Sequence, residues 1–277
     1  MVKTKHILGI DVGGTNIKYG LVTPRSQLIK SEQTLTPRTK AGIINLLVKI
    51  IYNYKSQINK IGIGLPGRLD LKQGKILHSP NLKLSGVPIT SLLKKKFNFP
   101  VKIDNDANCF TLAEALIGAG KGYQNVVGLT LGTGVGGGIV INKKIYHGRS
   151  SAGELGHQFI DFRQNKELED FLGAKKLKLS SADYQKLEQQ AKKCNKQAIK
   201  FFNNLGSTLG FGLVNLIRIL DPDIIILGGK QSKAYNLFRH QMTKTINKHY
   251  PAKPPKIVKS KLIDKAGIIG AALLFKK

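Results

Sequence analysis

The feature that most constrains this chain is a glycine-rich hairpin pattern that occurs twice. The first copy is HILGIDV, GGT and NIKYGLV over residues 6–22, and the second contains LTLGTGVGGGIVI and spans residues 126–141. In each copy a short apolar run leads into glycines and returns as a second apolar run. This pattern predicts two antiparallel strands joined by a tight turn. The copies lie about 120 residues apart, which suggests duplicated domains.

The rest of the chain alternates predicted helices with predicted strands. GIINLLVKIIYNYKSQI and AIKFFNNLGSTLGFGLVNLIRIL have apolar residues at helical spacing, whereas KIGIGLPG and PDIIILGG are short apolar runs typical of buried strands. Such alternation predicts an α/β fold with helices on the sheet faces. A length of 277 residues favours two domains over one.

The composition is strongly basic, with 45 Lys and Arg against 16 Asp and Glu and a net charge of +29. Such a field would attract nucleic acid, an anionic membrane or a polyanionic substrate. The lysines are scattered, however, and the densest clusters, LLKKKF and GAKKLKLSS, lack interleaved aromatic residues. No apolar run approaches the roughly 18 residues that cross a bilayer, and no signal-peptide core is present. We expect a cytoplasmic protein with no specific nucleic-acid site and no membrane contact.

Three glycine turns follow apolar strands, in DVGGT, GTGVGGG and LGGK. Bare backbone N–H groups in such turns can converge on an anion. A hairpin alone also favours glycine. A hairpin by itself does not need Asp11, Thr15 or Thr133. The side-chain oxygens of these residues suit a magnesium ion or phosphate. The Walker pattern and the dinucleotide-binding strand–helix pattern are both absent, which disfavours those nucleotide folds.

The motifs DVGGTNIK, GIGLPG, NDANC, GTGVGGG and AGELGH stand in the order found in ROK-family sugar kinases. The resemblance extends over nearly the whole chain, from Gly9 to the closing AGIIGAAL. It implies two actin-like (ribonuclease H-like) α/β domains of the hexokinase superfamily, with ATP and sugar in the cleft between them. We place one domain at residues 1–115 plus 264–277 and the other at residues 116–263. The resemblance also makes a homodimer the expected assembly.

The resemblance assigns the glycine turns to Mg-ATP. Gly228 and Gly229 would lie near the adenosine. Asp11 ends its strand at a place where its carboxylate could hold Mg²⁺ through water. The complete expected set is Asp11, Gly13, Gly14, Thr15, Lys18, Thr133, Gly134, Gly136, Gly228 and Gly229.

The acceptor side needs one carboxylate, because phosphoryl transfer to a hydroxyl requires positioning, charge neutralisation and a base. In IDNDAN, Asp106 falls on the position of the family's general base, although N-capping alone would also explain it. Asp104 alternates to the other side of the strand. The sugar-binding residues implied by the resemblance are Gly67, Asn81, Asn105, Asp106, Glu154, His157 and Glu169.

One segment departs from the family pattern. Many members carry CxCGxxGC after the GH pair and bind a structural zinc there, but here the segment is GHQFIDFRQNKELEDFLG, without cysteine. A tetrahedral zinc site needs four nitrogen or sulfur ligands, so we predict no zinc. The loop must then be held by packing of Phe159, Phe162, Leu168 and Phe171, or stay mobile until sugar binds. A family branch without zinc uses polyphosphate as donor, which would give the basic composition a use.

The leading interpretation is an ATP-dependent glucokinase that phosphorylates the C6 hydroxyl of glucose. Alternatives are a polyphosphate-dependent glucokinase and an N-acetylhexosamine or fructose kinase. An interpretation of another class is a non-catalytic, sugar-responsive regulator; regulators of this family carry an N-terminal winged helix, whereas here the phosphate hairpin begins by residue 9. We also expect the cleft to close over the sugar, with a hinge near GAGKG at residues 118–122.

Overall fold

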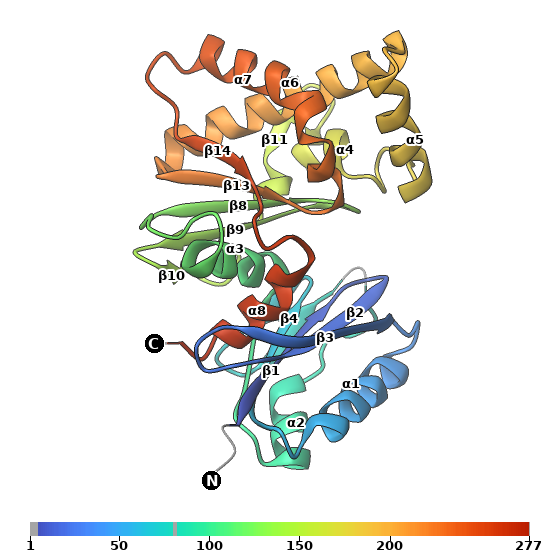
Figure 1. Cartoon of the computed structure of the whole chain (residues 1–277), viewed down its shortest axis with the longest axis vertical. Helices are drawn as coiled ribbons and strands as arrows, with labels where there is room; N and C mark the ends of the chain where they lie inside the picture. Colours follow the sequence, from blue (N-terminus) through green and yellow to red (C-terminus); the bar gives the residue numbers. More distant parts are fainter. Residues whose placement is uncertain (1–4, 80–81, 277) are drawn as a thin grey trace.

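The computed structural model describes residues 5–79 and 82–276, which form two five-stranded mixed sheets (Figure 1). The first sheet has the order β3 (Leu28–Leu35), β2 (Asn16–Val22), β1 (His6–Val12), β4 (Ile58–Leu65) and β7 (Val101–Asn105). The second has the order β10 (Lys144–Ile145), β9 (Val135–Ile141), β8 (Val126–Leu131), β13 (Ile224–Gly228) and β14 (Lys256–Lys259). In both sheets the first three strands in this order pair antiparallel and the last three pair parallel. The two predicted hairpins are confirmed as β1–β2 and β8–β9.

Helices cover both outer faces and fill the space between the sheets (Figure 1). The first sheet's outer face carries α1 (Lys40–Tyr54) and α2 (Ile89–Phe97). Between the sheets lie α3 (Asp106–Ile117) and α8 (Ala266–Leu273). The second sheet's outer face carries α4 (Leu168–Leu172), α5 (Ser181–Lys192), α6 (Lys196–Leu220) and α7 (Tyr235–His249). The α/β class with two sheet-and-helix units is confirmed; the exact boundaries proposed for the two domains stay a prediction.

Strand alternation explains how both faces of a sheet are covered. Along β4, Ile61 and Ile63 are fully buried in the core shared with α1 and α2. Gly62 lies between them and faces α8, where a Cβ atom would collide with the carbonyl oxygen of Ala271. Glycine at this position therefore lets α8 pack directly on the strand backbone.

Glycines in the second sheet likewise allow α3 to pack directly on the strand backbone. A Cβ atom on Gly128 of β8 or on Gly138 of β9 would collide with the side chain of Thr111. Thr111 is fully buried and its hydroxyl donates to the carbonyl oxygen of Ala107, 2.8 Å away. Part of the glycine richness of the second hairpin is thus required by the close approach of α3, a reason that the sequence pattern did not indicate.

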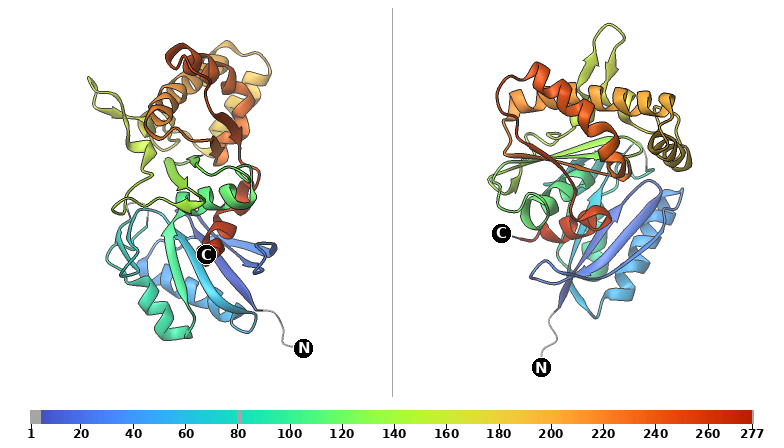
Figure 2. Two further views of the ribbon diagram at one scale, coloured as in Figure 1. Left: turned by 90° about the vertical axis from the view of Figure 1, so that its left-hand side faces the viewer. Right: turned by 45° about the horizontal axis from the view of Figure 1, so that its top comes forward.

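A short hairpin, β11 (Phe159–Asp161) and β12 (Lys166–Glu167), projects from the second sheet's side of the molecule (Figure 2). The prediction that four apolar residues pack here is correct for Leu168, which is buried, and for Phe171, which packs against the core. It is wrong for Phe159 and Phe162, whose exposed fractions are 58% and 83%. Phe159 begins β11, and Phe162 lies in the turn that joins β11 to β12. The prediction of no zinc stays a prediction.

Small elements complete the described part of the chain. They are β5 (Arg68–Asp70), β6 (Lys75–His78), and the 3-10 turns η1 (Leu155–His157), η2 (Lys230–Ala234) and η3 (Ile263–Lys265). None of the described helices is long and apolar enough to span a bilayer.

Candidate active site

Asp11 and Asp106 line one cavity of about 280 Å³ between the two sheets. Asp11 is near the end of β1 and Asp106 is the first residue of α3, which follows β7, so both carboxylates lie at the carboxyl edge of the first sheet. Thr130 of β8 and Gly229, which follows β13, contribute from the second sheet. Four lysines also line this cavity: Lys18, Lys230, Lys233 and Lys259. The four lysines outnumber the three carboxylates that line it, Asp11, Asp106 and Asp264, so the cavity is basic.

Burial raises the pKa of Asp106 to about 7, and the negative charges of Asp11 and Glu154 act in the same direction, while the backbone N–H of Ala107 opposes them. Burial likewise raises the pKa of Asp11 to about 6, against the lowering effect of Lys18. A carboxylate with a pKa near neutrality can take a proton and release it again at the pH of the cell.

Lys18 is held at the mouth of the cavity by Asp264 of η3. Its Nζ atom lies 2.9 Å from Asp264 Oδ1, and this bond holds the pKa of Asp264 below its usual range. The pair connects β2 with the segment that leads into α8. Lys18 is thus placed beside Asp11 with its ammonium group available to an anion in the cavity.

The glycine turn between β8 and β9 is anchored from two sides. Gln231 donates through Nε2 to the carbonyl oxygen of Gly132 at 2.9 Å. Glu169 accepts the backbone N–H of Val135 at 2.7 Å, and Lys175 donates its N–H to the oxygen of Thr133 at 3.0 Å. Gly134 lies against the Glu169 carboxylate, where a Cβ atom would collide with it. The sequence had assigned Glu169 to sugar binding; in the structure its carboxylate is bonded to this turn.

The remaining glycines of this turn and of the turn after β13 pack against neighbouring chain. Gly136 faces Thr130 and Ala107, and Gly228 faces the ring of Phe110. Gly229 has a φ of +80°, a left-handed backbone that glycine adopts without strain, and it borders the cavity with Asp11 and Asp106.

The turn between β1 and β2 is fixed to the end of β3. The backbone N–H of Gly13 donates to Asn16 at 3.0 Å, and the Thr36 hydroxyl donates to the oxygen of Gly13 at 2.7 Å. Thr36 also donates its N–H to the oxygen of Thr15 at 2.9 Å. Gly14 and Thr15 are exposed. Gly14 lines a separate cavity with Thr36, and this turn does not line the cavity of Asp11 and Asp106.

A second, smaller cavity adjoins the same end of α3. Three residues that the resemblance assigned to sugar binding line it together, namely Gly67, Asn105 and Glu154. Asn105 donates to the carbonyl oxygen of Gly67 at 3.3 Å and caps α3 through its side-chain oxygen, which accepts from Ala107 at 2.8 Å. This cavity has the polar groups expected of an acceptor site, but its volume of about 10 Å³ is room for one water, so a hexose enters only if the walls move apart.

His157 stands beside Glu154 but does not line the smaller cavity. Its Nδ1 atom lies 2.7 Å from Glu167 Oε2, and its Nε2 atom lies 4.0 Å from Glu154 Oε2. The hydrogen bond with Glu167 raises the pKa of His157. Asn81 lies outside the described residues.

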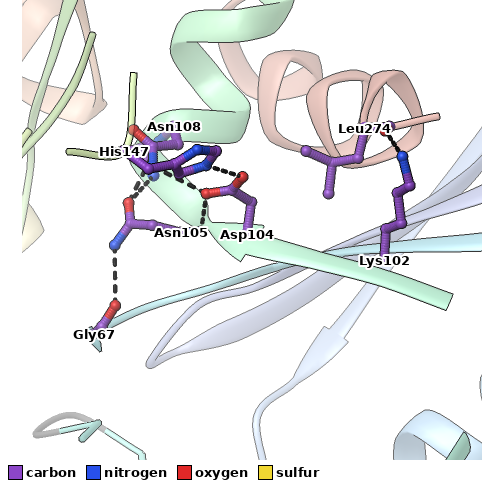
Figure 3. Close-up of polar contacts among 8 residues, drawn as sticks. Gly67, Lys102, Asp104, Asn105, Asn108, His147 and Leu274 are labelled. Atoms are coloured by element: carbon purple, nitrogen blue, oxygen red, sulfur yellow. Dashed lines mark hydrogen bonds and ion pairs between the residues drawn. The ribbon is translucent and has the colours of Figure 1, made fainter. Parts of the chain in front are cut away.

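Sequence reasoning missed two residues of this cavity, Asp104 and His147. Asp104 was expected on the other side of the strand from Asp106, and it does not line the cavity of Asp11 and Asp106. Its carboxylate is buried beside Asn105, lines the smaller cavity and pairs with His147 at 2.7 Å (Figure 3). A carboxylate two positions before Asp106 was visible in IDND, whereas nothing near residue 147 pointed to a partner for it.

The ROK family profile matches residues 7–277. The chain belongs to the ROK family. It is 31% identical to the N-acetyl-D-glucosamine kinase of Vibrio cholerae, covering 96% of this chain and 98% of that one, and 30% identical to the glucokinase of Thermotoga maritima, covering 98% and 97%. Among solved structures, the ROK family glucokinase of Streptomyces griseus in complex with glucose and AMPPNP superposes with a TM-score of 0.85 at 25% identity, covering 97% of this chain and 98% of that one. The protein is a sugar kinase.

Proposed function

We propose that this sugar kinase transfers the γ-phosphoryl group of ATP to the C6 hydroxyl of glucose, with Asp106 as the general base. The observation that carries the proposal is the position of Asp106 between two cavities. It lines the basic cavity with Asp11, and it is close enough to Glu154 of the smaller cavity for that charge to raise its pKa. A donor on one side and an acceptor on the other would meet at this carboxylate.

The basic cavity suits the phosphates of ATP. Lys18, Lys230 and Lys233 line this cavity and would offset the charge of the triphosphate. The turns at residues 14–15 and 133–134 lie beyond the lining of the cavity, so their backbone N–H groups would reach the phosphates only when the cleft closes. These contributions act by position and charge, because phosphoryl transfer needs little covalent chemistry from the protein.

Asp11 is the residue that would hold Mg²⁺. Among residues 5–79 and 82–276, no group of three or more His, Cys, Asp or Glu side chains forms a metal site. Mg²⁺ keeps several waters and is held by one or two carboxylates together with substrate phosphates, so the Asp11 carboxylate would be enough. When bound, the ion would neutralise charge on the phosphates during transfer.

Asp106 would take the proton of the sugar hydroxyl as the new O–P bond forms. Its half-buried carboxyl, raised to a pKa of about 7, is a stronger base than an ordinary aspartate at neutral pH. Asn105, Glu154 and Gly67 would orient the sugar. We further propose a homodimer, which size-exclusion chromatography with light scattering would test.

N-acetylglucosamine is the second candidate acceptor, because several relatives that match over 96% of this chain are named N-acetyl-D-glucosamine kinases. It differs from glucose only at C2, so the same base and donor geometry would serve both sugars.

The test is a coupled assay of ATP, GTP and polyphosphate against glucose, N-acetylglucosamine, mannose and fructose. We expect the highest kcat/KM with ATP and glucose, and a loss of about 10²- to 10⁴-fold in kcat for Asp106→Asn, the range typical of general-base removal. A variant that keeps near wild-type turnover would remove Asp106 from this role. Preference for polyphosphate or for another sugar would replace the donor or the acceptor while leaving the base in place.

A further inference from the structure

The Asp104 side chain joins the two sheets beside the acceptor cavity. It lies at the end of β7 in the first sheet, its side chain is 5% exposed, and its Oδ2 atom is 2.7 Å from Nε2 of His147. His147 follows β10 of the second sheet. Figure 3 shows the two side chains pointing toward one another at the start of α3.

The other oxygen of Asp104 holds the first turn of α3. Oδ1 accepts the backbone N–H of Asn105 at 2.8 Å and the side-chain amide of Asn108 at 2.9 Å. Asp106 lies between these two residues. Every bond of the Asp104 carboxylate is therefore made either to the turn that carries the base or to His147.

His147 opens the segment that forms the opposite wall of the cavity. Residues 150–154 of this segment line the cavity together with His147, and Ala152 donates its N–H to the oxygen of His147 at 3.2 Å. The segment ends at Glu154. The Asp104–His147 pair thus connects the cavity-lining segment 147–154, which follows β10 of the second sheet, to Asp104 at the end of β7 in the first sheet.

The pair also separates two spaces. Asp104 and His147 line both the acceptor cavity and a larger cavity of about 1150 Å³, which opens between α2 and β10.

A buried carboxylate without a cationic partner is strongly disfavoured, because it loses its hydration. The hydrogen bond that His147 donates to the Asp104 carboxylate raises the pKa of His147, which favours the imidazolium form.

We propose that Asp104 and His147 form a latch between the two sheets that sets the acceptor cavity, and that both are positioning residues for sugar binding. They act through Asn105 and through the wall at residues 150–154, without contact with the phosphoryl group. The inference rests on the proposed function only in naming a hexose as the occupant of the cavity.

His147→Ala tests the latch, because it leaves the Asp104 carboxylate buried and frees the wall. We expect the KM for the hexose to rise about tenfold, the size of one lost charge-assisted bond. The KM for ATP should stay within about twofold, because the donor cavity contains neither residue. His147→Gln keeps a donor near the position of Nε2 and should restore most of the hexose affinity.

The matched control is His240→Ala on the exposed side of α7, which should leave both KM values unchanged. Asp104→Asn, alone and combined with His147→Ala, completes a double-mutant cycle; the two changes should be less than additive in hexose KM. Should His147→Ala fail to fold, Asp104→Asn by itself still tests the latch, because it should raise the KM for hexose and leave the KM for ATP within about twofold.

Calorimetric titration of hexose without ATP separates this inference from the proposed reaction, because it needs no turnover. Tighter binding by the wild type than by His147→Ala supports the latch even if the donor is misassigned. Equal hexose affinity in the two proteins, or equal increases in the KM for hexose and for ATP, would overturn it. Absence of turnover with every hexose and donor tried would instead refute the proposed function.

Discussion

Glu114 on α3 is the buried charge whose loss should be easiest to measure. Its side chain is fully buried, and its Oε1 atom accepts the Ser260 hydroxyl at 2.5 Å and the N–H of Leu262 at 2.8 Å. Its Oε2 atom accepts the N–H groups of Ala119 at 2.8 Å and Lys261 at 3.2 Å. One carboxylate thus joins the two segments through which the chain passes between the second sheet and the central helices. One of them is the glycine-rich segment that the sequence suggested as a hinge.

Glu114→Gln keeps the shape of the side chain but replaces one of its two acceptor oxygens with an NH₂ group. In its best orientation the new amide donates to the Ser260 hydroxyl, which can rotate to accept, and leaves the N–H of Leu262 without a partner at about 1–3 kcal/mol. The bonds to Ala119 and Lys261 become neutral and weaken by about 0.5–1 kcal/mol each. We expect a net loss of about 3 kcal/mol of unfolding free energy, or roughly 6 °C in Tm for a chain of this size.

Urea unfolding followed by circular dichroism measures this loss directly. The control is Glu188→Gln on α5, where the carboxylate pairs with Lys192 at 2.7 Å on the surface. Exposed pairs of this spacing contribute about 0.3–0.5 kcal/mol. If the free energies of unfolding of Glu114→Gln and of this control differ by less than about 1 kcal/mol, the four hydrogen bonds of Glu114 do not stabilise the protein as argued.

Three further predictions test other parts of the structure. Gly62→Ala should lower the free energy of unfolding by about 1–3 kcal/mol, because its Cβ meets the backbone of Ala271. Gly132→Ala, with open space around it, should change that free energy by less than about 0.5 kcal/mol. Equal effects in a thermal melt would contradict the packing of α8 on β4. Glu169→Ala should raise the KM for ATP more than the KM for hexose, because its carboxylate bonds the turn at Val135, and steady-state kinetics showing the reverse would favour the sugar-binding role that the family resemblance implies. The kcat/KM for hexose should rise about tenfold per pH unit below pH 7 and level off above it, because Asp106, with a pKa of about 7, must lose its proton before it can act as base; a profile that is flat from about pH 5 to 8 would contradict this.

Local patterns along the chain determined much of this protein. The two hairpins, the α/β class and the placement of Asp106 at the start of a helix all follow from residues that are near neighbours in sequence. Strand alternation, glycine turns and an N-terminal cap are short-range properties, so one sequence is enough to identify them. The order of five motifs then indicated the family, which the comparisons confirmed.

Contacts between distant residues were decided only by the tertiary structure. Asp104 meets His147 across 43 positions, Glu169 meets Val135 across 34, and Glu114 meets Ser260 across 146. In the sequence, the neighbours of these carboxylates gave no sign of their distant partners, and the role expected of Glu169 came from the family resemblance alone. Their partners depend on how the two sheets stack around α3 and α8, because a side chain can choose a distant donor only after packing has brought that donor within hydrogen-bond reach.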